Sequence, residues 1–171
     1  MDEIEIVDYD PRWPNLFDEE AKRLRAILDP YPIMGLEHFG STAVPALSAK
    51  PIIDILIAVR SLADARTTFV EPLRNLDYVY WIENPRTDRM FFVKGMPPFG
   101  SGRSHHVHVT EPEGEMWRRL AFRDYLRGHP EEAQTYERLK RRLAAEHPAD
   151  RDAYTDAKSD YIETVMRKAI R

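Results

Sequence analysis

The chain has 171 residues, of which 43% are hydrophobic, and its 25 basic and 29 acidic residues leave a formal net charge of −4. This length and composition allow one well-buried core, so we expect a single domain over residues 1–171. The near-balanced charge argues against a broad basic surface made for duplex nucleic acid. There is no cysteine, which excludes disulfides, zinc-thiolate sites and thiol nucleophiles.

The first residues and the longest apolar run of the chain bear on its cellular location. The acidic start, MDEIEIVDYD, lacks the basic and then apolar pattern of a secretion signal. The longest apolar run contains Asp54 and falls short of the roughly 20 residues that a membrane-spanning helix needs. We therefore expect a soluble, cytoplasmic protein with no membrane partner.

The first 60 residues predict a helix and two strands. Residues 3–7 alternate apolar and charged side chains, which indicates a short strand or extended arm. After Asp10-Pro11, apolar residues recur at helical spacing from Trp13 to Leu28, and the two prolines of the DPYP segment end this helix. A strand over Ile33–Phe39 and a buried strand over Pro51–Val59 follow.

The rest of the chain predicts further strands and then only helices. Ser61 is placed to cap a helix running to about Asn75. Three more strands are expected, over Tyr78–Ile82, Met90–Lys94 and His105–Thr110. From Gly114 onward the pattern is helical, and Pro130 and Pro148 divide it into three helices. We expect an α+β fold with a mixed or antiparallel sheet flanked by helices, sheet-rich over residues 1–110 and helical over residues 114–170.

One carboxylate, Asp54, lies inside the most apolar run of the chain, Pro51–Val59. Burying an unpaired carboxylate costs several kcal/mol, so its surroundings must supply a cation, hydrogen-bond donors or a metal ion. A structural pairing with an arginine or with backbone N–H groups satisfies this requirement, and so does a functional site.

The segment before Asp54 has features of a phosphate-binding turn. Gly40 permits close approach of the backbone, and Ser41 and Thr42 add hydroxyl donors. Lys50 is placed to reach a phosphate or to neutralise Asp54. A serine after a glycine also caps a helix, so this signal alone does not establish a site.

The SHHVHVT segment contributes candidate ligands. On a strand, His106 and His108 point to one face, whereas His105 points with Val107 to the other. Together with Asp54 from a neighbouring strand they would make a set of two histidines and one carboxylate, which suits a transition metal more than Mg²⁺. The alternative is that these imidazoles hydrogen-bond to the backbone or to a phosphate.

The order of these features resembles the DNA polymerase beta-like nucleotidyltransferase superfamily. There a Gly-Ser loop binds the nucleotide phosphates and an acidic strand about a dozen residues later holds Mg²⁺; here 12 residues separate Ser41 from Asp54. The superfamily strand offers a second carboxylate two positions on, where this chain has Leu56. Leu56 weakens the case for two-metal catalysis, because Mg²⁺ needs several oxygen ligands.

A closer resemblance covers essentially the whole chain. The segments YDPRWPNLFDEEAKRL, EHFGSTAVPALSAKPIIDI, HHVHVTEP, LAFRDYLRGHPEEAQTYERLKRRLA and DRDAYTDAKSDYIETVM resemble the GrpB family. The family implies a nucleotidyltransferase-like fold with a helical C-terminal part, and its members are sometimes fused to dephospho-CoA kinase. Its motif positions correspond to Glu37, His38, Gly40, Ser41, Thr42, Lys50, Asp54, His106, His108, Arg123, Asp124 and Lys158.

These residues lead to three functional hypotheses. The first is a nucleotidyltransferase-like protein that binds a nucleotide or other phosphorylated small molecule and uses Mg²⁺, Mn²⁺ or Zn²⁺ at Asp54, His106 and His108. Gly40, Ser41, Thr42, Lys50 and Arg123 would hold its phosphates. The second is a catalytically inactive nucleotide-binding module linked to coenzyme A biosynthesis, which Leu56 favours. The third is a metal-dependent phosphohydrolase.

Overall fold

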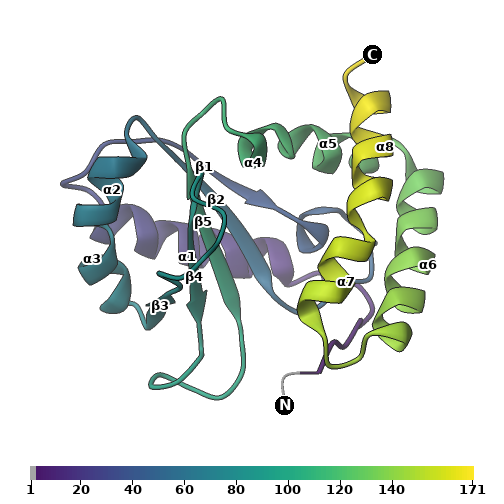
Figure 1. Cartoon of the computed structure of the whole chain (residues 1–171), viewed down its shortest axis with the longest axis horizontal. Coiled ribbons are helices and arrows are strands. Elements are labelled where there is room, and N and C mark those ends of the chain that lie inside the picture. The colour runs from purple at the N-terminus through teal and green to yellow at the C-terminus, as the bar shows by residue number, and fades with distance from the viewer. Residues whose placement is uncertain (1–2) are drawn as a thin grey trace.

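A five-stranded mixed sheet forms the centre of the structure, a computed structural model in which residues 3–171 are described (Figure 1). Its strands, in spatial order, are β1 (Ile33–Phe39), β2 (Ile53–Val59), β5 (His105–Thr110), β4 (Met90–Lys94) and β3 (Tyr78–Tyr80). The central pair, β2 and β5, is parallel, and the other neighbours are antiparallel. The α+β fold with a mixed sheet is therefore confirmed.

The first face of the sheet is covered by helices from the N-terminal half of the chain. These are α1 (Trp13–Ile27), α2 (Leu62–Thr68) and α3 (Val70–Arg74). Figure 1 shows α1 behind the strands. The main hydrophobic core lies between these helices and the sheet, and it includes Leu24, Ile55, Ile57, Val107 and Phe92, all fully buried.

The second face carries the side chains of interest. Because alternate residues of a strand point to opposite faces, Asp54 and Leu56 share this face with His106 and His108. Part of it is covered by α4 (Glu115–Arg118) and α5 (Leu120–Gly128). Leu56 packs there, and the part of the face beside Asp54 is left more open.

The C-terminal helices α6 (Pro130–Glu146), α7 (Arg151–Ala157) and α8 (Ser159–Ala169) stand beside the strands in Figure 1. Val44 and Leu47, just after the Gly-Ser turn, pack in one cluster with side chains of α5, α6 and α8. This cluster holds the helices against the segment that leads into β2. Within residues 3–171, no helix is long and apolar enough to span a membrane.

Most of the helices and strands expected from the sequence form, and a few of them begin or end at other residues than expected. β1, β4 and β5 have the expected limits, and Ser61 caps α2 by accepting a hydrogen bond from the Asp64 N–H. β2 begins at Ile53, because the backbone still turns at Ile52, whose N–H bonds the Lys50 carbonyl. The expected third strand is shorter and ends at Tyr80.

The number of helices was underestimated. The expected helix after Ser61 is interrupted at Phe69, and the C-terminal block contains five helices instead of three. Pro130 does begin α6, but further breaks fall at Arg119 and Lys158, where the backbone keeps helical angles and only the hydrogen-bond ladder is interrupted. Such breaks lack the proline or glycine that marks a helix end in a sequence. Residues 3–7 are extended, and Val7 forms an isolated bridge with Ala49.

Candidate functional site

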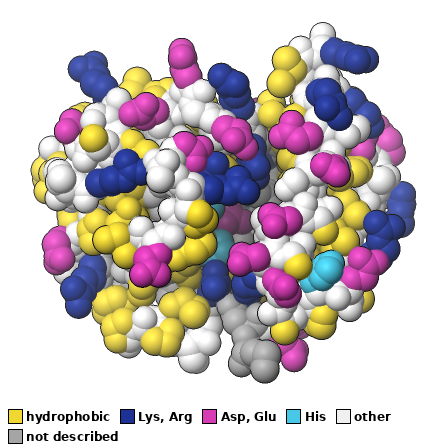
Figure 2. Space-filling view, viewed as in Figure 1, with side chains coloured by type: hydrophobic (Ala, Val, Ile, Leu, Met, Phe, Trp, Pro, Cys, Tyr) yellow, Lys and Arg dark blue, Asp and Glu magenta, His cyan; other side chains and the backbone are white. Residues whose placement is uncertain are grey.

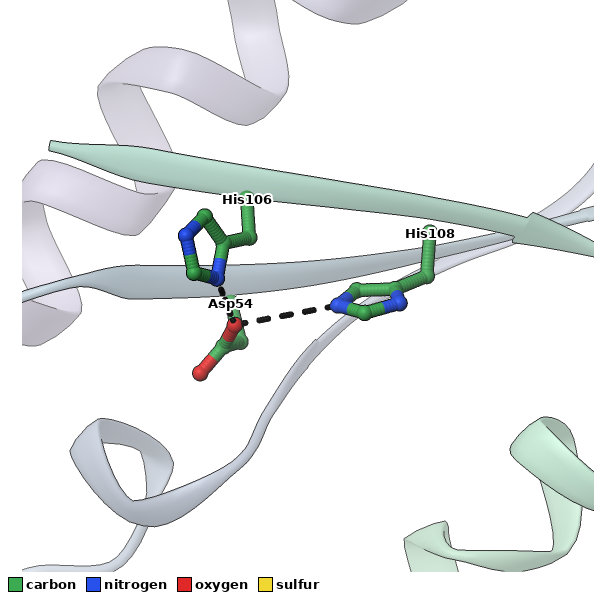
Figure 3. Close-up of side chains that lie close together, drawn as sticks. All are labelled: Asp54, His106 and His108. Atoms are coloured by element: carbon green, nitrogen blue, oxygen red, sulfur yellow. Dashed lines mark hydrogen bonds and ion pairs between the residues drawn. The ribbon is translucent and has the colours of Figure 1, made fainter. Parts of the chain in front are cut away.

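Asp54, His106 and His108 form a cluster on the second face of the sheet (Figure 3). The Asp54 Oδ1 atom lies 3.1 Å from His106 Nδ1 and 3.8 Å from His108 Nε2. One potential ligand atom from each residue lies within 4.8 Å of the other two. The predicted convergence of the acidic strand and the histidine strand is confirmed.

Strand register brings the cluster together. β2 and β5 pair in parallel with Asp54 opposite His106 and Leu56 opposite His108. The period of two along β5 places both imidazoles on the face of the carboxylate. His105 points to the opposite face, as expected, where burial lowers its pKa and Glu20 of α1 acts in the opposite direction.

The local environment favours the protonation states of a metal site. Burial raises the pKa of Asp54, but the contacts with His106 and His108 outweigh it, so the pKa lies well below its ordinary value. Burial lowers the pKa of His108, although Asp54 acts in the opposite direction. Near neutral pH the site therefore offers an ionised carboxylate and a neutral imidazole at position 108, the forms that bind metal ions.

The cluster fits a divalent transition metal ion. Ligand atoms about 2.1 Å from such an ion are separated from one another by about 3.0 to 3.4 Å. The 3.1 Å distance from Asp54 to His106 lies in this range, and the 3.8 Å distance to His108 exceeds it. The other ring nitrogens, His106 Nε2 and His108 Nδ1, are buried and have no hydrogen-bond partner in the described part of the chain. Ligand histidines usually donate from that nitrogen, so we expect metal affinity about 10-fold to 100-fold below that of a fully supported site.

The Gly-Ser turn lies against the carboxylate. Gly40 has a φ of +73°, and a Cβ atom built on it would lie 2.7 Å from Asp54 Oδ2. A short 3-10 helix, Ser41–Ala43, follows. Only glycine accommodates both the backbone angle and the close approach, so the turn and Asp54 are fitted to each other.

Thr42 makes internal contacts. Its side chain is buried, donates a hydrogen bond to the Ile52 carbonyl at 3.3 Å and contacts His38 Nε2 at 2.9 Å. Burial lowers the pKa of His38 to about 4, so this imidazole is neutral at pH 7 and donates to the Thr42 hydroxyl. The pair ties β1 to the segment before β2. Ser41 is less buried than Thr42, and its side chain hydrogen-bonds with Tyr136 of α6.

A pocket opens beside the cluster. Its empty volume is about 400 Å³, part of it open to solvent. Figure 2 shows a cleft at this position, with basic side chains and a histidine inside it, between the sheet and the C-terminal helices. The lining residues are Ser41, Thr42, Ala49, Lys50, Ile52, Asp54, His106 and Lys158. Predicted phosphate-binding and metal-binding residues therefore share one pocket.

Lys158 reaches this pocket from the helical part of the chain. It occupies the junction between α7 and α8, and its Nζ lies 4.1 Å from the centre of the Tyr154 ring. Lys50 Nζ lies 5.1 Å from the centre of the same ring. Such contacts stabilise ammonium groups at the edge of a pocket.

Arg123 lies elsewhere and has structural partners. Its guanidinium donates to Glu37 at 2.8 Å, to the His38 carbonyl at 2.7 Å and to Asp124 at 2.8 Å. The residue is buried and does not line the pocket described above. We therefore assign Arg123 to the contact between β1 and α5, in place of the predicted contact with phosphate.

The position of the superfamily's second carboxylate is part of the core. Leu56 is fully buried and packs with Phe39 and Met116 under α4. On the neighbouring strand β1, Leu56 is paired with Glu37, whose carboxylate forms an ion pair with Arg123. No second acid therefore joins Asp54 from this position.

Comparisons with known proteins match almost the whole chain. A family model described as GrpB protein matches residues 3–168. The chain belongs to the GrpB family. A crystal structure of the conserved GrpB protein from Enterococcus faecalis is 36% identical, with a TM-score of 0.83 and coverage of 96% of both chains. The GrpB relationship predicted from the sequence segments is confirmed.

Other GrpB relatives differ in length. A UPF0157 protein from Pseudomonas aeruginosa is 50% identical over 99% of this chain and 69% of its own length. The glutamate-rich protein GrpB of Alkalihalophilus pseudofirmus is 32% identical over 97% of this chain and 95% of its own. A dephospho-CoA kinase from Mycolicibacterium paratuberculosis is 28% identical over 97% of this chain, which spans 46% of that protein.

Sequence reasoning identified most of the pocket but not all of it. Lys158 corresponds to a family motif position, yet nothing in its helical surroundings indicated that it lies near Asp54. Lys140 does not line the pocket, and its burial also carried no signal in the sequence, because a lysine on a long amphipathic helix usually faces solvent. In the structure it is 2% exposed and donates to the Ser48 carbonyl.

Proposed function

We propose that the protein binds a nucleotide or another phosphorylated small molecule in this pocket together with a divalent metal ion, and that it transfers a nucleotidyl group. The observation that supports this most is that Asp54 and His106 share one pocket with Ser41, Lys50 and Lys158. Phosphate ligands are bound in proteins by hydroxyls, ammonium groups and metal ions acting together. The resemblance to the nucleotidyltransferase superfamily is a second support.

In this proposal each residue has a defined task. Asp54, His106 and His108 hold the metal ion, which supplies positive charge against the phosphate oxygens. Ser41 and the backbone of the Gly40 turn contact the phosphate nearest to that ion, and Lys50 neutralises its charge. The acceptor enters from the open side of the pocket. We also propose a functional link to dephospho-CoA kinase, supported by a relative of that name.

A metal-dependent phosphohydrolase is the second candidate. Leu56 argues against two-metal nucleotidyl transfer, because a fully buried leucine stands where that chemistry employs a carboxylate. Two imidazoles and one carboxylate also suit Mn²⁺ or Zn²⁺ more than Mg²⁺. Nucleotidyl transfer from a triphosphate releases pyrophosphate, whereas hydrolysis of a phosphomonoester releases orthophosphate. Binding of a nucleotide without release of either product would indicate the third alternative, a catalytically inactive nucleotide-binding module.

The test is a thermal-shift panel of nucleotides and coenzyme A precursors, each with and without Mg²⁺, Mn²⁺ and Zn²⁺. A ligand that binds only the folded state raises the melting temperature. We expect stabilisation by a phosphorylated ligand that depends on metal and is lost in Asp54→Asn, but kept in Asp18→Asn, which alters an exposed acid of α1. An identical response from wild type and Asp54→Asn would contradict the metal role. Active samples are then assayed for pyrophosphate and orthophosphate.

A further inference from the structure

The segment between β1 and β2 is held by side chains of helix α6. At the start of this segment, the side chain of Ser41 hydrogen-bonds with Tyr136. Near its other end, Glu137 Oε2 accepts a hydrogen bond from the Ser48 N–H at 3.0 Å, and Lys140 donates to the Ser48 carbonyl. Side chains from little more than one turn of α6 therefore hold the segment at two points.

The ring of Tyr136 is fixed by packing among three helices. The residue is 4% exposed. Its ring stacks on the Tyr161 ring of α8, with centres 5.5 Å apart and planes 3° from parallel, and it meets the Phe122 ring of α5 edge-on at 5.1 Å. Because side chains in a packed core have little freedom to turn, these contacts set the direction in which the Tyr136 hydroxyl points.

The two hydroxyls of the contact between Tyr136 and Ser41 differ in their access to the pocket. Ser41 lines the pocket together with Asp54, whereas Tyr136 lies behind it in the helical cluster. Burial raises the pKa of Tyr136 to about 12, so the phenol keeps its proton near neutral pH. A phenol is more acidic than an aliphatic alcohol and is therefore the better donor of the two. When it donates to Ser41 Oγ, the proton of Ser41 is left for a partner in the pocket.

We propose that Tyr136 is a positioning residue, which orients the Ser41 hydroxyl so that it donates to a phosphate oxygen in the pocket. This inference rests on the proposed function, which assigns a phosphate to Ser41, and it adds a residue outside the pocket that governs the affinity. Ionised phosphate oxygens accept hydrogen bonds, so Ser41 binds one only when its own proton is free. A hydrogen bond accepted by Ser41 Oγ also polarises the O–H group and strengthens the bond that it donates.

The experiment is a double-mutant cycle between Tyr136→Phe and Ser41→Ala. Titration calorimetry measures the affinity for ATP and for tripolyphosphate in buffer containing Mg²⁺. Phenylalanine keeps the ring stack and removes only the hydroxyl, and we expect Tyr136→Phe to lower the affinity for both probes about 3-fold to 10-fold, the usual effect of one hydrogen bond. In the Ser41→Ala background the same substitution should change the affinity less than about twofold, because its effect acts through Ser41.

Tyr161→Phe is the matched control. It removes a hydroxyl from the same ring stack, but this hydroxyl donates to Glu132 Oε1 at 2.5 Å instead of to Ser41. Each of the two tyrosine variants should lower the melting temperature by about 2 to 4 °C, as expected for the loss of one hydrogen bond in a domain of this size. Only Tyr136→Phe should weaken the binding of the two probes.

The results that overturn this inference differ from those that overturn the proposed function. If Tyr136→Phe and Tyr161→Phe affect affinity equally, or if the loss in Tyr136→Phe persists in the Ser41→Ala background, Tyr136 only stabilises the fold and phosphate binding stands. A loss confined to ATP also overturns the inference, because ATP and tripolyphosphate share a chain of three phosphates. If wild type binds neither probe, the inference falls, and the thermal-shift panel decides separately whether another phosphorylated ligand binds.

Discussion

Gly40 and Asp54 are in such close contact that no side chain fits between them: a Cβ atom on Gly40 would lie 2.7 Å from Asp54 Oδ2. The glycine also has a φ of +73°, a conformation that costs other residues roughly 1 to 2 kcal/mol. The turn therefore holds the carboxylate in place on the side away from the histidines.

Substituting Gly40 by alanine should disturb the site directly. We expect Gly40→Ala to lower the free energy of unfolding by about 1 to 3 kcal/mol and to weaken metal binding, because either the turn or Asp54 must move. Urea denaturation and a Mn²⁺ titration measure the two effects. Gly128→Ala is the matched control, since a Cβ atom there would meet nothing within 4 Å. Equal behaviour of the two variants would contradict the proposed fit.

Arg123 should contribute to the stability of the fold and not to the binding of phosphate. Arg123→Met leaves Glu37 and the His38 carbonyl without their partner, so we expect a loss of about 2 to 4 kcal/mol in the free energy of unfolding. The affinity of the folded variant for tripolyphosphate should stay within about twofold of wild type, a change of less than 1 kcal/mol. Arg142→Met, at an exposed pair with Glu146, is the control. A selective loss of phosphate affinity would restore the role predicted from the sequence.

Introducing a second acid two positions after Asp54, as in the nucleotidyltransferase superfamily that the sequence resembles, should destabilise the fold. Leu56→Asp places a carboxylate in a fully buried position against Phe39 and Met116, which should cost about 3 to 5 kcal/mol. Leu56→Met, which conserves volume, should cost less than about 1.5 kcal/mol. Chemical denaturation of both variants is the measurement. A stable Leu56→Asp protein with increased Mg²⁺ affinity would show that this position tolerates a second ligand.

Lys140 should make stability depend on pH. Burial lowers its pKa in the folded protein to about 7, below the value of about 10.4 in an unfolded chain. Between these values the unfolded chain binds more protons, so the free energy of unfolding rises with pH from about 7 toward 10. We expect the stability of wild type relative to Lys140→Met to increase by about 2 kcal/mol from pH 6.5 to 9. A constant difference across that range would contradict the lowered pKa.

The grouping of Asp54 with His106 and His108 could be predicted because its signals are local. A period of two places His106 and His108 on one face of a strand, and a carboxylate among β-branched residues indicates that Asp54 needs a partner. The sequence did not show which strand would pair with which. That depends on the parallel register of β2 and β5, which is set by the whole apolar pattern of the sheet.

The helical side of the pocket was beyond prediction for a different reason. Whether Lys158 and Arg123 face a ligand, a carboxylate or solvent depends on how α5, α7 and α8 pack against the sheet. Arg123 lies on the amphipathic helix α5 and Lys158 at the junction of α7 and α8, where a basic side chain fits several environments equally well. Arg123 turned out to be buried against Glu37, whereas Lys158 lines the pocket.

The parallel pairing of β2 with β5 also determines when the site comes into existence during folding. Asp54 and His106 are 52 positions apart in the chain, and parallel neighbours cannot be joined by a hairpin. Contacts of such long range form late, after the loop-closure entropy between them has been overcome. Local helices and hairpins alone therefore do not bring Asp54 and His106 together, and the rate at which these two side chains come into contact on refolding reports the formation of the central sheet.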